Sequence, residues 1–142
     1  VPHIPFEALD ENYVIDWEAY LSYFRKMHRL FPKCKKMVMA VRNQIASSHH
    51  TLSGLLYDAV EDQLYTTRIY DIQPIVDPMG VGDAFIAAYI HAHQKWGDEN
   101  QYCLDFSLSA SAIKNTIPGD QNLVSEEEII SNMTSSGGRI QR

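Results

Sequence analysis

The feature that most constrains this chain is the run Asp-Pro-Met-Gly-Val-Gly-Asp at positions 77–83, followed at once by the apolar residues 84–90. A short apolar stretch precedes the run, which therefore lies where a strand gives way to a helix. Glycine lets the backbone turn sharply and come close to a ligand. A helix that begins there directs free N–H groups and the positive end of its dipole outward. The run predicts an anion-binding site, with Asp83 at its edge able to accept a proton.

A simpler interpretation of the same residues is a tight turn whose aspartate caps a helix, which is a common arrangement. The length of the run and the residues that follow it favour a ligand site instead. Asp77, which opens the run, can cap the turn by accepting hydrogen bonds from backbone amides.

Residues 77–90 closely resemble the C-terminal signature of the ribokinase-like (PfkB) carbohydrate kinases, which usually reads Asp-Thr-x-Gly-Ala-Gly-Asp-Ala-Phe. The likeness continues through residues 106–114 (Phe-Ser-Leu-Ser-Ala-Ser-Ala-Ile-Lys) and 116–120 (Thr-Ile-Pro-Gly-Asp). Within that family, residues 122–125 and 138–140 are similar to 2-keto-3-deoxygluconate kinases. The resemblance covers most of positions 36–142 and is specific from 75 to 125.

Composition excludes several classes of partner. The net charge of -6 argues against binding to nucleic acid or to an anionic membrane. No apolar stretch approaches the roughly 20 residues that span a bilayer. Cys34 and Cys103 fit no metal-ligand spacing and indicate a reducing compartment. Since the N-terminus carries prolines and acidic residues where a signal peptide needs an apolar run, we expect a cytoplasmic protein.

Strands that alternate with helices predict an α/β layered fold. The resemblance implies a ribokinase-like three-layer fold with a mainly parallel sheet, of which this chain is the C-terminal part only. We expect a linker or arm at residues 1–15, the nucleotide-binding part of a sugar kinase domain at 16–134, and a flexible tail at 135–142. Because the chain begins Val-Pro-His, we interpret it as a fragment of a longer kinase.

Hydrophobic periodicity and capping residues predict the individual elements. The expected helices are one that Asp16 caps and Pro32 ends, one at 82–96 that Gly97 ends, and two with capping boxes, Asp98 with Gln101 and Ser125 with Glu128. The expected strands are a buried parallel strand at 36–41, a pair at 51–57 and 63–70 joined by a turn at 58–62, and a short strand at 72–76. Between the first two strands, we expect a polar loop at 42–51.

Phosphoryl transfer needs positioning, neutralisation of phosphate charge and a group that accepts the hydroxyl proton. The backbone N–H groups of Gly80, Val81, Gly82 and Asp83 would form an anion hole. Asp83 would act as the general base, and the family resemblance implies the same role. Val81 stands where the family usually carries a smaller residue, but its backbone N–H group remains available.

The resemblance implies further ligand contacts. Arg42, which follows an apolar strand, would reach the phosphates of ATP. Leu108 and Ser111 would border the adenine, and Leu108 would pack against the ring where the family often has asparagine.

Two metal ions are also implied. Asp77 would help to hold a monovalent cation such as K⁺, together with backbone oxygens near Met79 and in residues 116–119. Mg²⁺ would arrive with ATP, bound largely through phosphates and water.

The sequence therefore predicts the ATP-binding and base-bearing portion of an enzyme that phosphorylates a sugar acid, most specifically 2-keto-3-deoxygluconate. In the family, the N-terminal half of the kinase supplies most sugar contacts and the lid. We therefore expect the chain alone to be inactive and to bind nucleotide weakly. Apolar surface exposed where that half packs would permit self-association. The alternative is a non-catalytic α/β module that uses its anion loop for binding or assembly.

Overall fold

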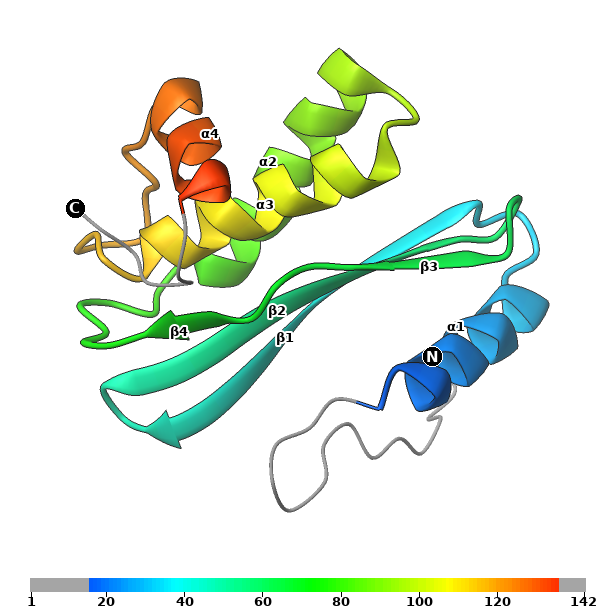
Figure 1. Ribbon diagram of the computed structural model, residues 1–142, viewed down its shortest axis with the longest axis horizontal. Coiled ribbons are helices and arrows are strands. Elements are labelled where there is room, and N and C mark those ends of the chain that lie inside the picture. Colours follow the sequence, from blue (N-terminus) through cyan, green and yellow to red (C-terminus); the bar gives the residue numbers. More distant parts are fainter. Residues whose placement is uncertain (1–15, 136–142) are drawn as a thin grey trace. The chain divides into compact units, whose positions relative to one another are not determined.

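The computed structural model describes residues 16–135, whose elements follow the order α1-β1-β2-β3-β4-α2-α3-α4 (Figure 1). The predicted arm at 1–15 and the predicted tail, apart from Ser135, lie outside the described residues. The chain divides into two compact units, one formed by Val1–Met37 with Tyr57–Leu64 and the other by Val38–Leu56 with Tyr65–Arg142. Among the described helices, none has the length and apolar character needed to cross a membrane.

In the first unit, α1 (Trp17–Leu30) begins where the sequence predicts, because Asp16 caps it. The Asp16 carboxylate accepts a hydrogen bond from the backbone N–H of Ala19 at 3.0 Å. The helix buries Tyr20 and Phe24. The Phe24 ring stacks on Tyr57, with 5.8 Å between ring centroids.

The predicted turn at 58–62 is confirmed and also lies in the first unit. It connects β2 (His49–Asp58) to β3 (Gln63–Thr66). Asp62 adopts the left-handed conformation with φ of 52°, which short polar side chains tolerate. Its carboxylate accepts hydrogen bonds from Arg25 Nε at 3.0 Å and from the Tyr57 hydroxyl at 2.6 Å. These bonds lower the pKa of Asp62 to about 2.

The strands form one sheet in the order β1-β2-β3, in which β4 (Tyr70–Ile72) also pairs with β2. The β2–β4 pair is antiparallel, with His50 opposite Ile72. Only Ser47 and Ser48 separate β1 (Lys36–Ala46) from β2, and so short a connection requires antiparallel neighbours. The α/β class is confirmed, whereas the mainly parallel sheet direction is not confirmed among the described strands.

The predicted polar loop at 42–51 is wrong, because both strands continue through it. Residues 42–46 extend β1 and residues 49–51 open β2. Most residues from 42 to 48 are exposed at this end of the hairpin, so their polarity reflects contact with solvent and did not mark a loop. Arg42 consequently lies within a strand and not after one.

The predicted strand at 63–70 is interrupted at residues 67–69. The Thr67 hydroxyl accepts a hydrogen bond from the Gly54 N–H at 2.8 Å and donates one to the Arg68 carbonyl at 2.7 Å. The Thr67 N–H still bonds to the Gly54 carbonyl of β2 at 3.0 Å, but the Gly54 N–H bonds to the Thr67 hydroxyl and not to a backbone carbonyl, so the regular ladder with β2 is interrupted there.

The predicted strand at 72–76 is also wrong beyond Ile72. Pro74 has no N–H to donate to a ladder. The next donors bond outside the sheet: the N–H of Ile75 to the Ser48 carbonyl at 3.0 Å, and that of Val76 to the Asn115 carbonyl at 2.9 Å. The segment before the glycine run is therefore tied to the end of a helix.

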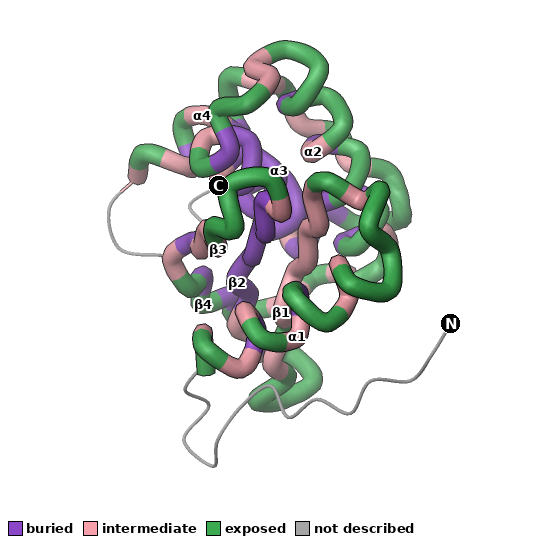
Figure 2. The backbone as a smooth tube through the Cα atoms, turned by 90° about the vertical axis from the view of Figure 1, so that its right-hand side faces the viewer, coloured by how far each residue is buried: buried purple, intermediate pink, exposed green. Residues whose placement is uncertain are grey.

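In the second unit, α2 (Val81–Trp96), α3 (Asn100–Lys114) and α4 (Glu126–Thr134) lie on one face of the sheet (Figure 1). α3 and the middle of β2 contain most of the buried residues (Figure 2). Leu104 and Leu108 of α3 pack with Leu52 and Leu56 of β2 and with Phe85 of α2.

The helix ends follow the capping predictions with one exception. Gly97 ends α2 with φ of 59°, and Ser125 with Glu128 forms the predicted capping box of α4. The predicted Asp98–Gln101 box is wrong, since α3 has no side-chain cap. The Gln101 amide instead donates to the Thr66 carbonyl at 2.9 Å.

His50 gives the fold a pH dependence that can be measured. Its ring is buried in β2, and burial, followed by the charges of Arg42 and His49, lowers its pKa below 6.5. Protonation therefore favours the unfolded chain, and stability falls as the pH drops below about 6.5. We expect the urea midpoint to decrease from pH 7.5 to 5.5, and to decrease less in His50→Phe. Equal decreases in the two proteins would contradict this assignment.

Candidate functional site

The turn before α2 requires glycine at position 80 for two independent reasons. Gly80 has φ of 76°, and a Cβ atom there would lie 2.3 Å from the backbone oxygen of Asp120. The N–H of Ala84 makes the first helical hydrogen bond, to the Gly80 carbonyl at 2.8 Å. No side chain caps α2, so its first-turn N–H groups are left for another acceptor.

Gly82 and Asp83 occupy the first turn of α2 with space in front of them. A Cβ atom on Gly82 would meet nothing within 4 Å. Asp83 is exposed, and its carboxylate makes no capping hydrogen bond with the helix. The simpler interpretation, in which Asp83 serves only as a helix cap, therefore has no hydrogen bond to support it.

The segment before the turn is bound to the segment after α3. The Asn115 carbonyl accepts hydrogen bonds from the N–H groups of Val76 at 2.9 Å and Asp77 at 3.2 Å. The two carboxylate oxygens of Asp77 accept from the N–H groups of Met79 at 2.9 Å and Gly119 at 2.7 Å. These backbone bonds, with the nearby charge of Lys114, lower the pKa of Asp77. Asp77 thus stays ionised and ties the two turns together.

Two buried side chains near the C-terminal end of α3 also contact the backbone of the same turn. The buried Ser111 hydroxyl donates to the Val81 carbonyl at 2.9 Å. The buried Lys114 ammonium donates to the Ile117 carbonyl at 2.8 Å and lies 3.5 Å from the Asp77 carbonyl oxygen. The position of the anion-facing N–H groups is therefore set by α3.

A mainly apolar slot of about 300 Å³ lies along α2, and its lining begins at Ala84, the residue after Asp83. Its lining comes from α2, α3, α4 and the segment between the last two helices: Ala84, Ala87, Ala88, His91, Phe106, Ala110, Asn122, Val124, Glu126 and Ile129. Asn122 Nδ2 donates to the Ala110 carbonyl at 3.2 Å, which fixes the orientation of the amide. Asn122 Oδ1 is buried without a partner among the described residues. The slot therefore combines apolar walls with one unused hydrogen-bond acceptor.

The rim of the slot contains a small charged cluster. The Glu126 carboxylate bonds to His91 Nε2 at 2.8 Å and to Lys95 Nζ at 2.5 Å. These two bonds lower the pKa of Glu126. The rim is thus polar while the interior remains apolar.

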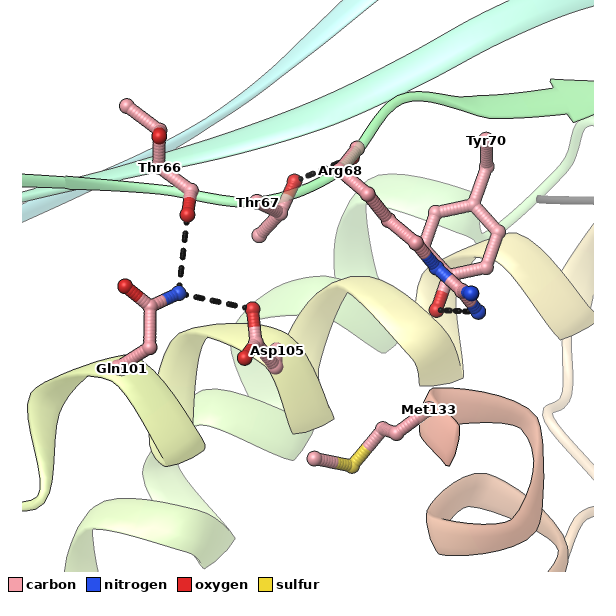
Figure 3. A pocket seen from close by; sticks show the side chains of 7 residues that line it. All are labelled: Thr66, Thr67, Arg68, Tyr70, Gln101, Asp105 and Met133. Atoms are coloured by element: carbon pink, nitrogen blue, oxygen red, sulfur yellow. Dashed lines mark hydrogen bonds between the residues drawn. The ribbon is translucent and has the colours of Figure 1, made fainter. Parts of the chain in front are cut away.

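A second cavity, of about 230 Å³, lies between the β3–β4 segment and α3 (Figure 3). Its polar groups are largely used by one another: Gln101 bonds to Asp105, and Arg68 bonds to the Tyr70 hydroxyl. Arg68 also donates to the Asn132 carbonyl of α4 at 2.6 Å. This cavity contains no glycine turn, and its arginine serves to anchor α4.

The structure brings together part of the predicted site. Gly80, Val81, Gly82 and Asp83 form the first turn of α2 and its cap, and Asp77 adjoins them. The other three predicted residues lie elsewhere. Arg42 is exposed on β1, Leu108 is fully buried in the core, and the Ser111 hydroxyl is bonded to backbone.

None of those three lines the slot; on α3, Phe106 and Ala110 do so instead. Sequence reasoning missed Asn122, although it lies in the Asn-Leu-Val-Ser segment that contributed to the resemblance. Its position two residues after the turn at residues 118–120 was the one feature of the sequence that could have indicated a role for Asn122 in the site.

Comparison with known proteins gives matches among solved structures alone. No protein-family model and no curated protein matches the chain. A PfkB family carbohydrate kinase from Listeria grayi is 30% identical, with a TM-score of 0.75 over 80% of this chain and 34% of its own. A 2-dehydro-3-deoxygluconokinase from Thermotoga maritima is 29% identical, with a TM-score of 0.78 over 84% of this chain and 35% of its own.

The chain therefore spans about a third of the length of these kinases. The predicted resemblance to PfkB carbohydrate kinases and the ribokinase-like fold are confirmed over that third.

The requirement for glycine at position 80 can be tested against a matched glycine. Gly119 also has a positive φ, of 82°, but a Cβ atom there would meet nothing within 4 Å. Gly119→Ala should cost about 1–2 kcal/mol from backbone strain alone. Gly80→Ala should cost more, because the Asp120 carbonyl must also move. Urea denaturation measures both losses, and equal losses would show that the close contact has no effect.

Proposed function

We propose that this chain, which has the fold of the PfkB carbohydrate kinases, is the ATP-binding and base-bearing part of a sugar-acid kinase. The main support for this proposal is the start of α2. The helix begins after Gly80 without a side-chain cap, its first turn contains the exposed Asp83, and an apolar slot lies along the same helix. For the substrate, we propose 2-keto-3-deoxygluconate. The similarity to the Thermotoga maritima 2-dehydro-3-deoxygluconokinase, whose name denotes the same sugar acid, supports this choice.

The adenine would lie in the slot beside α2. The small side chains of Ala84, Ala87 and Ala88 leave room for a flat ring, and Phe106 offers an aromatic neighbour. The adenine amino group can donate to Asn122 Oδ1, the buried acceptor that lacks a partner. A buried acceptor left without a partner costs roughly 1–3 kcal/mol, and a donor from the ligand would remove that cost.

The triphosphate would extend toward the start of α2. The N–H groups of Gly80, Val81, Gly82 and Asp83, together with the helix dipole, would neutralise charge on the transferring phosphoryl group. Open space over Gly82 allows close approach of the phosphate to the backbone. Mg²⁺ would be held by phosphate oxygens and water. Among the described residues, no group of three or more His, Cys, Asp or Glu side chains could hold a metal ion.

Asp83 would accept the proton from the primary hydroxyl of the sugar acid. The hydroxyl oxygen then bonds to the γ-phosphorus, while the bond from that phosphorus to the bridging oxygen of the β-phosphate breaks. ADP leaves with the electron pair of the broken bond, and the proton remains on the Asp83 carboxyl. The exposure of Asp83 suits this role, since the sugar must reach it from outside this chain.

The position of the adenine can be tested with two tryptophan substitutions on α2. Ala87 lines the slot, whereas Ile90, which is also exposed to solvent, does not. Ala87→Trp should fill the slot and weaken ADP binding by at least about tenfold, that is by about 1.4 kcal/mol. Ile90→Trp should leave ADP binding unchanged. Calorimetric titration of both variants decides the point, and a normal affinity in Ala87→Trp would rule the slot out.

The base assignment is tested by Asp83→Asn in the complete kinase. We expect kcat to fall by a factor of about 10²–10⁴ while ADP affinity is retained, because the amide cannot accept the proton. Glu127→Gln changes another exposed carboxylate in the first turn of a helix and serves as the control. Unchanged phosphorylation in Asp83→Asn refutes the assignment. Nucleotide binding without any phosphorylation by the unmodified kinase supports the non-catalytic module instead.

A further inference from the structure

Lys114 is a fully buried lysine at the junction of the two turns that form the site. Its relative exposure is 0%, which is rare for a lysine. The side chain ends at two backbone carbonyls: Ile117 O accepts its hydrogen bond at 2.8 Å, and Asp77 O lies 3.5 Å away. One of these oxygens follows α3 and the other precedes α2, so the ammonium lies between the two segments.

The surroundings of this ammonium are rich in oxygen and carry a negative charge. The Asp77 carboxylate is close enough for Lys114 to contribute to the lowering of its pKa. Removing an ammonium from water costs several kcal/mol, which is recovered only where oxygens and an opposite charge surround it. The buried cation therefore has a defined position and a defined set of acceptors.

The family resemblance implies a monovalent cation in this region, held by Asp77 and by backbone oxygens of residues 116–119. The described residues do not fit an additional ion there. Both Asp77 carboxylate oxygens already accept backbone N–H groups, from Met79 and Gly119. The carbonyls of Asp77 and Ile117 already face the Lys114 ammonium, which has the charge of K⁺ and a similar size.

We propose that the Lys114 ammonium is a built-in substitute for an exchangeable monovalent cation, which holds the turn before α2 against the turn after α3. Lys114 is a positioning residue: it acts through the backbone of Asp77, and so on the N–H groups that follow. It follows that neither the turn nor the anion site that it forms requires K⁺. The statement about the anion site rests on the proposed function, whereas the statement that the Lys114 ammonium replaces a monovalent cation does not.

The test uses the full chain in solutions of equal ionic strength that contain either KCl or choline chloride, because choline is too large to enter the site. The unmodified chain should have the same Tm in both salts. Lys114→Ala should have a lower Tm in choline, and KCl or methylammonium chloride should raise it by roughly 3–5 °C. Lys95→Ala, which removes a surface lysine bonded to Glu126, should show no such dependence on the cation.

A second readout distinguishes positioning from general support of the fold. ADP affinity of the unmodified chain should be equal in the two salts. For Lys114→Ala it should fall at least tenfold in choline and recover in KCl, which a merely structural lysine would not produce. If Lys114→Ala does not fold, the same measurements are made on Lys114→Leu, which keeps much of the apolar part of the lysine side chain and leaves space for K⁺ where the ammonium group was.

Three results would overturn the inference: a Tm of the unmodified chain several degrees higher in KCl than in choline, variants that respond equally to both salts, or ADP affinity that does not depend on Lys114. If the unmodified chain binds no ADP, the proposed function fails. The dependence of Tm on the cation still tests the role of Lys114 in that case.

Discussion

The carboxylate of Asp77 is the constraint on which the rest of the site depends. Its two oxygens bind Met79 N–H and Gly119 N–H, which lie on segments 40 residues apart in the sequence. This bridge places the Asp120 carbonyl so close to Gly80 that no side chain fits between them. The turn is thereby fixed, and α2 begins with free N–H groups directed outward. The Asn115 carbonyl and the side chains of Ser111 and Lys114 hold the same turn at other atoms, so the bridge acts together with the end of α3.

α3 is a buried helix that contacts both ends of the proposed nucleotide site, the glycine turn and the slot. Its final turns hold the glycine turn through Ser111 and Lys114, while Phe106 and Ala110 line the slot. Leu104 and Leu108 point instead into the core with β2. The same burial that stabilises the fold therefore sets the position of the anion hole relative to the slot.

Most features that depend on neighbouring residues were predictable from the sequence, with the Asp98–Gln101 capping box as the exception. Asp16, Gly97 and the Ser125–Glu128 capping box mark helix ends through contacts within one or two turns. Features that depend on tertiary pairing were not. The hairpin through residues 42–51 looked like a polar loop, and residues 73–76 looked like part of a strand although the N–H groups of Ile75 and Val76 bond to distant carbonyls. Packing decides which face of α3 lines the slot, and the sequence does not show it. For this reason Leu108 and Ser111 were predicted to border the adenine, and Asn122 was not predicted.

Binding of phosphate by the first turn of α2 can be observed by amide NMR. The isotope-labelled chain is titrated with ADP and, separately, with adenosine. We expect ADP to shift the amide signals of Gly80, Val81, Gly82 and Asp83, and adenosine to shift the signals of the slot residues Ala87 and Asn122 but not those four. Shifts confined to the second cavity around Arg68, or equal effects of the two ligands on the glycine turn, would contradict it.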